Sequence, residues 1–261
     1  MMNKKNSSFL GLLIILATGL LLSCLSILPL NAVEGLMLGS QADTLYYYST
    51  DLRIEGLSAR NTKYKISAQY PVFTNMDEFH KHNLEKYTYE LMSEILLHHI
   101  LENDKIDFGN DIVALANAVM QDWLSKDAYN SVYRMEDSIC VEIVLNSEIT
   151  TFKVSHWGDW SGAHGYYTEN YYMLDKNLHP IEHTSIINPN KLSQFNTLLM
   201  NEFDHKKYDH RVYDERWLLN PDMYALTREG LVVIYYGSST VEGNPQTLIP
   251  IEKIKDVLTQ Y

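Results

Sequence analysis

One spacing in the sequence is typical of zinc hydrolases. His179, Glu182 and His183 form an H-x-x-E-H pattern, in which two imidazoles would bind a metal ion and the glutamate would activate water. That chemistry needs a helix, and Pro180 stands between the two histidines while Asn188-Pro189 follows shortly after. We therefore expect no metal at this pattern.

The remaining histidines do not form an obvious metal site either. His80 and His82 lie two residues apart on a predicted helix and face different ways, and His98 and His99 are adjacent. The sequence has no phosphate-binding glycine loop ahead of a helix and no cysteine cluster. We expect neither a metal nor another cofactor.

Residue types of a catalytic triad also occur close together. Asp159, Ser161 and His164 are so near in the sequence that their side chains could hardly line up in one turn. An envelope hydrolase that uses His164 with a nearby carboxylate, Asp159 or Glu169, is the alternative function that the sequence leaves open.

An aromatic segment carries the better functional signal. It runs from Trp157 to Leu174 and reads WGDWSGAHGYYTENYYML, which predicts a strand, a glycine turn and a second strand. Its aromatic rings could stack on sugars or anchor a protein, or they could fill a core, since alternate strand residues face inward. The predicted ligand-binding residues are Trp157, Trp160, His164, Tyr166 and Tyr167.

The glycines of this segment are expected to shape the turn. Gly158, Gly162 and Gly165 are predicted to supply positive φ angles and a close backbone approach. His164 then lies at the turn itself.

The elements that position this segment are helices and strands in separate runs. Such runs predict an α+β fold, with an antiparallel meander sheet and helices packed against it. The expected elements are a strand over Lys63–Tyr70 ended by Pro71, helices over Asn75–His99 and Asp111–Leu124, two strands over Ser131–Val154 with a turn at 146–148, a helix after Asn188-Pro189, a hairpin turning at 228–230, and a short helix from Pro250.

The N-terminal segment predicts membrane targeting. Lys4 and Lys5 precede an apolar run over Phe9–Leu30, long enough to span a bilayer. The run also holds Leu21-Leu22-Ser23-Cys24, which resembles a lipobox with Cys24 as the lipidated residue. A peptide anchor and a lipid anchor remain open, and both place the domain outside the cytoplasm. The predicted divisions are 1–30 as signal peptide or anchor, 31–62 as tether and first edge segment, and 63–261 as one domain with parts 63–150 and 151–261.

The net charge limits the kinds of partner, and the cysteines limit the kinds of chemistry, that the sequence predicts. The formal net charge is −12, which disfavours nucleic acid and is compatible with attraction of a cationic partner. The chain has two cysteines, and Cys140 lies in an alternating strand pattern, where we expect a small buried group rather than a reactive thiol.

The order of these pieces resembles a known family. An SGAHG turn, an aromatic strand, a helix, a hairpin and a closing LIPIEKIKDVL are similar to the RsiV-like extracytoplasmic family over Tyr64–Leu258. The family's usual turn is GGAHG, and Ser161 replaces its first glycine. The resemblance implies a domain shared by lysozyme-sensing anti-sigma factors and some polysaccharide deacetylases.

The rest of the sequence limits what this resemblance implies. The eight residues before the apolar run are too few for a cytoplasmic sigma-binding domain, and no added catalytic domain is expected. The expectation is a non-enzymatic, membrane-tethered binding protein of the bacterial envelope. Its implied ligands are peptidoglycan fragments or a cationic protein such as lysozyme.

Overall fold

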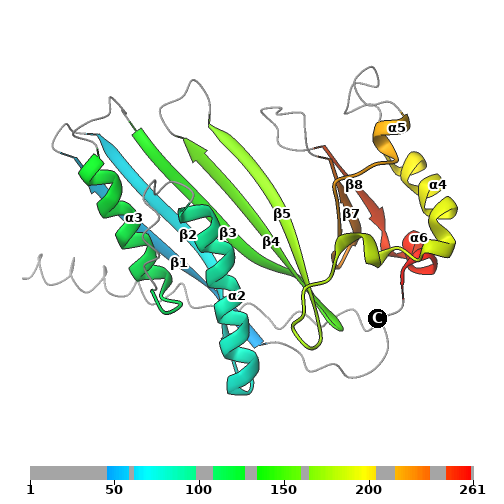
Figure 1. Cartoon of the computed structure of the whole chain (residues 1–261), viewed down its shortest axis with the longest axis horizontal. Helices are drawn as coiled ribbons and strands as arrows, with labels where there is room; N and C mark the ends of the chain where they lie inside the picture. Colours follow the sequence, from blue (N-terminus) through cyan, green and yellow to red (C-terminus); the bar gives the residue numbers. More distant parts are fainter. Residues whose placement is uncertain are drawn as a thin grey trace, which may run out of the picture. The chain divides into compact units, whose positions relative to one another are not determined.

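A five-stranded sheet with two helices on one side forms the larger part of the fold (Figure 1). The structure is a computed structural model that describes residues 46–58, 62–97, 108–126, 134–159, 165–203, 215–235 and 245–259. The sheet has the order β1-β2-β3-β4-β5. Its strands are β1 (Tyr46–Leu57), β2 (Lys63–Thr74), β3 (Arg134–Asn146), β4 (Ile149–Asp159) and β5 (Tyr166–Asp175), and its helices are α2 (Glu78–Leu97) and α3 (Ile112–Lys126).

The pairing confirms the α+β class but corrects the predicted antiparallel meander. β3, β4 and β5 do form an antiparallel meander, and β1 pairs antiparallel with β2. β2 and β3, however, are parallel. Parallel neighbours need a long crossover, and the segment that holds α2 and α3 supplies it. The sheet is therefore mixed.

β2 continues past the proline that was predicted to end it. Pro71 pairs with Ser49 of β1, and β2 runs on to Thr74. The pairing of β2 with β3 stops at Gln69 and Cys140, so Pro71 lies where β2 no longer has β3 beside it. A proline is tolerated there because no ladder hydrogen bond to β3 is lost.

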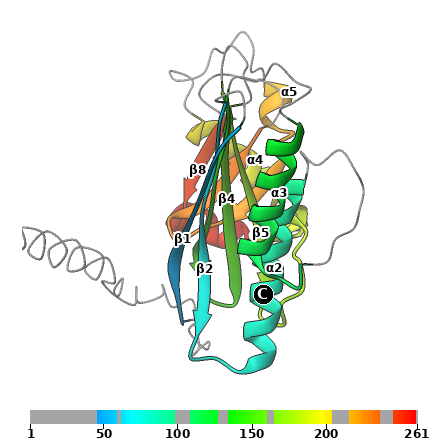
Figure 2. The ribbon, with the colours of Figure 1, turned by 90° about the vertical axis from the view of Figure 1, so that its left-hand side faces the viewer.

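The main core lies between the sheet and these two helices. Figure 2 shows α2 and α3 on the same side of the sheet. Fully buried Leu84 and Leu96 of α2 and Leu115 of α3 belong to one apolar cluster with Phe152 and Val154 of β4. The helical spacing in the sequence predicted both helices, and the burial of one face of each explains why they form here.

A second, three-stranded sheet follows in the chain. Its strands are β6 (Met223–Leu226), β7 (Gly230–Ile234) and β8 (Gln246–Pro250), all antiparallel. The predicted hairpin between β6 and β7 is confirmed, whereas β8 was not predicted. The accompanying helices are η1 (His183–Ile186), η2 (Pro189–Lys191), α4 (Leu192–Glu202), α5 (Glu215–Leu218), α6 (Ile251–Ile254) and η3 (Lys255–Val257).

This C-terminal part has its own apolar core, which reaches the larger sheet. The cluster combines Phe195, Leu199 and Tyr235 with Tyr171 and Met173 of β5. Asn188 caps η2 by accepting a hydrogen bond from the backbone N–H of Asn190 (2.9 Å), with Pro189 at the first position, as predicted.

Candidate functional site

Strand alternation divides the predicted aromatic site between two faces of the larger sheet. Phe152, Val154 and His156 of β4 face α2 and α3, because the first two belong to the core cluster and the third has the same parity. Trp157 points to the other side. We call the side away from α2 and α3 the open face.

Two of the five predicted binding residues lie together on the open face. Trp157 of β4 and Tyr167 of β5 are directly opposite in the register. Trp157 is half-buried, and Tyr167 is 39% exposed. Such a cross-strand aromatic pair forms a flat apolar surface that is partly exposed to solvent.

The other three predicted residues are not brought to this pair. Tyr166 has the opposite parity to Tyr167 and lies on the helix side of the sheet, in contact with His156. Trp160 and His164 lie outside the described residues. The structure therefore supports a smaller aromatic site than the sequence predicted.

A short row of polar residues extends the aromatic pair across the sheet. Ser138 of β3 is opposite Trp157, and Ser67 of β2 is opposite Ser138. Strands lie about 4.8 Å apart, so the row from Ser67 to Tyr167 spans roughly 14 Å. Small hydroxyls beside aromatic rings offer hydrogen bonds without blocking access to the rings.

The Tyr167 ring is held by a polar network on the open face. Its hydroxyl donates to Glu169 Oε1 (2.8 Å), and Glu169 also forms an ion pair with Lys153. Gln246 of β8 donates to Glu169 Oε2 (3.2 Å). Burial alone would raise the pKa of Glu169, but the hydrogen bonds from Lys153 and Tyr167 outweigh it and lower that pKa.

This network argues against Glu169 as a general acid in the alternative hydrolase function. A general acid must hold a proton near neutral pH, and the lowered pKa keeps Glu169 ionised. Both oxygens of the carboxylate already accept hydrogen bonds. Asp159 ends β4 opposite Glu136 of β3, and His164 lies outside the described residues.

The charged groups of the open face are largely paired. Arg53 of β1 forms an ion pair with Glu55, and Lys65 of β2 with Glu136 of β3. The ion pair of Lys153 with Glu169 is the third. The acidic side chains of Asp51, Glu142 and Asp159 have the same parity, so the surroundings of the aromatic pair are polar and of mixed charge.

A buried polar cluster on the helix side was not predicted. His156 Nε2 lies 3.1 Å from Asp137 Oδ1, and these residues are 7% and 0% exposed. The hydroxyl of Tyr166 lies 3.2 Å from the same nitrogen. Burial, and then the Asp137 carboxylate, raise the pKa of Tyr166 above its usual value. His156 shares the parity of buried Val154, and this spacing was the signal that could have revealed a buried histidine.

The geometry of this cluster differs from that of a catalytic triad. In a triad the carboxylate and the nucleophile bind different nitrogens of the imidazole. Here Asp137 and Tyr166 both meet Nε2 of His156. One nitrogen cannot donate to Asp137 and accept from Tyr166 at the same time, so the arrangement holds the strands together rather than relaying a proton.

The glycines of the aromatic segment are needed because a side chain would not fit there, and not because of a positive φ angle. Gly158 and Gly165 are not among the described glycines with positive φ, which corrects the sequence prediction. A Cβ at Gly158 would lie 2.5 Å from the ring of Tyr166, and one at Gly165 would lie 3.1 Å from Nε1 of Trp157. The predicted close approach is therefore confirmed at both. Gly162 lies outside the described residues.

The H-x-x-E-H pattern does not lie on a helix. Pro180 forms a β-bridge with Leu174, and the short η1 begins only at His183. His179 is exposed and lies 3.4 Å from Asp175, while the ring of His183 packs near Tyr224. Among the described residues, no group of three or more His, Cys, Asp or Glu side chains could hold a metal ion.

The other sequence candidates are placed only in part. His80 bonds Asp77 near the start of α2, and His82 is exposed. His98 and His99 lie outside the described residues. Cys140 is half-buried, and its thiol donates to Gln69 Oε1 (3.3 Å).

The predicted membrane segment lies outside the part of the chain that can be described. This applies to Cys24 and to the run over Phe9–Leu30. Within the described ranges, no helix is both long and apolar enough to cross a bilayer.

The structure is thus an α+β domain with a five-stranded mixed sheet, two helices on one face of that sheet and a smaller C-terminal sheet. No family model and no curated protein matches the sequence. Among solved structures, the chain is similar to a member of the DUF3298 family from Bacteroides fragilis, with a TM-score of 0.58 and 14% identity over 83% of this chain and 94% of the other. A DUF3298 protein from Pseudomonas aeruginosa PAO1 gives 0.54 and 12%, over 82% and 95%. At these identities the likeness shows the fold alone.

Proposed function

We propose that this chain is a membrane-tethered, extracytoplasmic binding protein of the bacterial envelope, and that its ligand is a peptidoglycan fragment bound on the open face. The pairing of Trp157 with Tyr167 is the observation that carries the proposal. The similarity to DUF3298 structures is compatible with the RsiV-like resemblance of the sequence, and the envelope location rests on the N-terminal segment.

The surroundings of the aromatic pair favour a glycan as the ligand. Sugar rings stack on flat aromatic faces, and their hydroxyls need short polar partners nearby. Ser67 and Ser138 continue the row beyond Trp157. The three ion pairs of this face bring opposite charges together, so those six groups exert little net attraction or repulsion on a largely neutral sugar chain.

The tyrosine of the pair is also held in place before any ligand binds. Its hydroxyl donates to Glu169, which Lys153 and Gln246 fix in turn. A side chain that is already ordered loses less conformational entropy on binding. The network therefore supports recognition rather than turnover at this surface.

A cationic protein such as lysozyme is the second candidate ligand. The net charge of −12 favours it, since a strongly acidic protein attracts basic partners at long range. Such attraction should weaken steeply as salt is added, whereas stacking on aromatic rings should not.

Cosedimentation of the full chain, in detergent, with purified insoluble peptidoglycan tests the proposal. We expect Trp157→Ala and Tyr167→Ala each to raise the dissociation constant about tenfold, because truncation of a central aromatic contact costs about 1.4 kcal/mol or more. Phe79→Ala is the matched control, since Phe79 is an aromatic residue of α2 with 68% exposure. Equal binding by all three variants would refute the open face as the site.

Parallel arms separate the remaining alternatives. Salt-sensitive capture of lysozyme with no peptidoglycan binding would favour the cationic partner. Release of soluble fragments that stops in His164→Ala would favour the hydrolase. Loss of detergent-phase partitioning in Cys24→Ser would identify the lipid anchor.

A further inference from the structure

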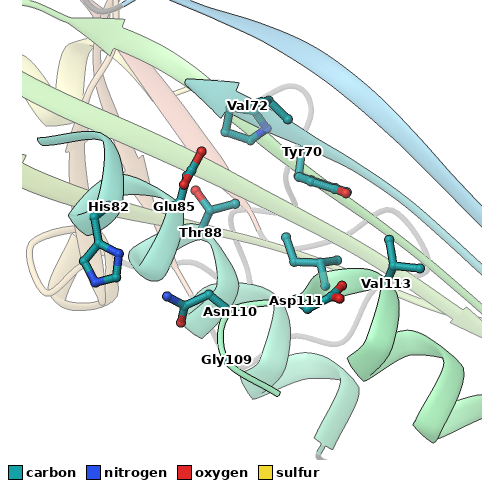
Figure 3. A pocket seen from close by; sticks show the side chains of 11 residues that line it. Tyr70, Val72, His82, Glu85, Thr88, Gly109, Asn110, Asp111 and Val113 are labelled. Atoms are coloured by element: carbon teal, nitrogen blue, oxygen red, sulfur yellow. The ribbon is translucent and has the colours of Figure 1, made fainter. Parts of the chain in front are cut away.

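A cleft on the helix side of the sheet is separate from the open face. It lies where the middle of α2 faces the start of α3 beside the end of β2, and its volume is about 430 Å³. Figure 3 shows Glu85 and Thr88 of α2 together with Val113 of α3 and Asp111, which immediately precedes α3; Tyr70 of β2 lies above them in this view. A hollow of this volume is within the range of small-ligand sites.

The cleft combines carboxylates with an aromatic ring. Glu85 and Asp111 both line it, as does the ring of Tyr70. A tyrosine phenol is uncharged at neutral pH, and burial, and then the charge of Asp111, raise the pKa of Tyr70 further. A cleft lined by carboxylates and an uncharged phenol ring suits a cation, which the ring face and the acids both attract.

Among the described residues that line this cleft there is one basic side chain, His82, and no lysine or arginine. The side chain of Glu85 is half-buried and makes no ion pair or hydrogen bond among the described residues. Lys86, the next residue of α2, lies 3.6 Å from Glu90 instead. Asp111 accepts from the backbone N–H of Ala114 through Oδ1 (2.9 Å).

The apolar part of the lining suits an alkyl chain. Val72 and Val113 are half-buried and exposed respectively, and Ile112 is 8% exposed. Lysine and arginine side chains bury their methylene stems along such surfaces while the charged end meets polar groups.

We propose that the cleft between α2 and α3 binds an alkyl chain that ends in an ammonium or guanidinium group. In this proposal the carboxylates of Glu85 and Asp111 contact the cationic group, and the ring of Tyr70 lies beside it. The group can belong to a free amine or to a lysine or arginine side chain of a basic partner. This site is independent of the glycan site, because none of its residues belongs to the open face.

Calorimetric titration of the full chain in detergent with n-butylammonium chloride, and with an acetylated, amidated Gly-Lys-Gly peptide, tests the proposal. We expect saturable binding of at least one of the two probes and none of n-butanol, which has the same alkyl chain without charge. Binding of the amine indicates a free ligand, and binding of the peptide alone indicates the side chain of a partner.

Two variants remove one charge each while leaving the fold in place. Glu85→Gln keeps the shape of the side chain, and Asp111→Asn keeps an acceptor that caps α3 equally well. We expect each to weaken binding about tenfold, as for the loss of a charge-assisted hydrogen bond. Glu90→Gln removes the same charge from α2 outside the cleft and should leave affinity unchanged.

Three results would overturn the proposal. The first is an equal loss of affinity for the cationic probes in Glu90→Gln and in Glu85→Gln. The second is binding of n-butanol as strong as that of n-butylammonium, and the third is no saturable binding of either cationic probe. Peptidoglycan binding by Glu85→Gln should stay at the wild-type level, which keeps failure of this site distinct from failure of the open face.

Discussion

Replacing Gly158 by alanine should destabilise the fold through one specific ring. A Cβ at this position would lie 2.5 Å from both Cε1 and the hydroxyl oxygen of Tyr166. The ring must therefore move away from His156, which it meets edge-on with centroids 5.0 Å apart. The hydrogen-bonding contact of 3.2 Å between the two side chains would be lost as well.

The magnitude follows from these contacts. Overpacking of a filled site costs about 1–3 kcal/mol, and an aromatic pair contributes about 0.5–1.5 kcal/mol beyond its buried area. We expect Gly158→Ala to lower the free energy of unfolding by about 2 kcal/mol, and the melting temperature by about 4–8 °C for a domain of this size.

A double-mutant cycle assigns the effect to the ring. Unfolding in urea would be measured for Gly158→Ala, Tyr166→Ala and the combination. Once the Tyr166 ring is gone, alanine at 158 should cost less than about 0.5 kcal/mol, since alanine is otherwise preferred to glycine within a strand. The same cost in both backgrounds, or no cost in either, would refute this explanation of Gly158.

Other perturbations have equally definite outcomes. Gly230→Ala should cost about 3 kcal/mol or more in urea unfolding, because φ is +151° and a Cβ there would overlap the carbonyl oxygen of Ile249; a loss below about 1 kcal/mol would contradict this. Glu169 has a lowered pKa, so its contribution to stability should be complete above its ordinary value of 4.5 and lost as pH falls through the lowered pKa. Lys153 has a raised pKa, because its hydrogen bond to Glu169 outweighs burial, and its contribution should persist below 10.5 and be lost as pH rises through the raised pKa. The stability difference between wild type and Glu169→Gln should therefore shrink toward pH ~3, and a pH-independent difference would argue against the ion pair. Burial raises the pKa of the Cys140 thiol to about 11. Alkylation of Cys140 in the folded protein at pH ~8, followed by mass spectrometry of its peptide, should therefore be at least about tenfold slower than alkylation of a free thiol; an equal rate would contradict it.

Local patterns in the sequence were sufficient for the long helices and for most strands, although not for β8, and they were not sufficient for all of the strand pairing. The helical spacing of Leu84 and Leu91 predicts α2, and alternation predicts β3 and β4, because each signal depends on residues close in the chain. The parallel pairing of β2 with β3 joins segments on either side of two helices. No local pattern encodes such a pairing, so the meander prediction was wrong at this point.

The candidate site shows the same limit at the level of single residues. The sequence identified Trp157, Tyr166 and Tyr167 as aromatic candidates, but their faces depend on which residues of β4 and β5 are opposite each other. The register places Tyr166 against His156 and leaves Tyr167 on the open face. The sequence predicted β3, β4 and the turn between them, but not the register of this pair, which brings Asp137 to His156.

Oxidative footprinting of the full chain with and without a soluble peptidoglycan fragment tests the glycan site most directly. Hydroxyl radicals label exposed aromatic side chains, so a bound ligand should protect those that it covers. We predict protection of Trp157 and Tyr167 on the open face, with unchanged labelling of Phe79 on α2. Saturable fragment binding that leaves Trp157 and Tyr167 labelled as before would contradict the proposal that this sheet face holds the ligand.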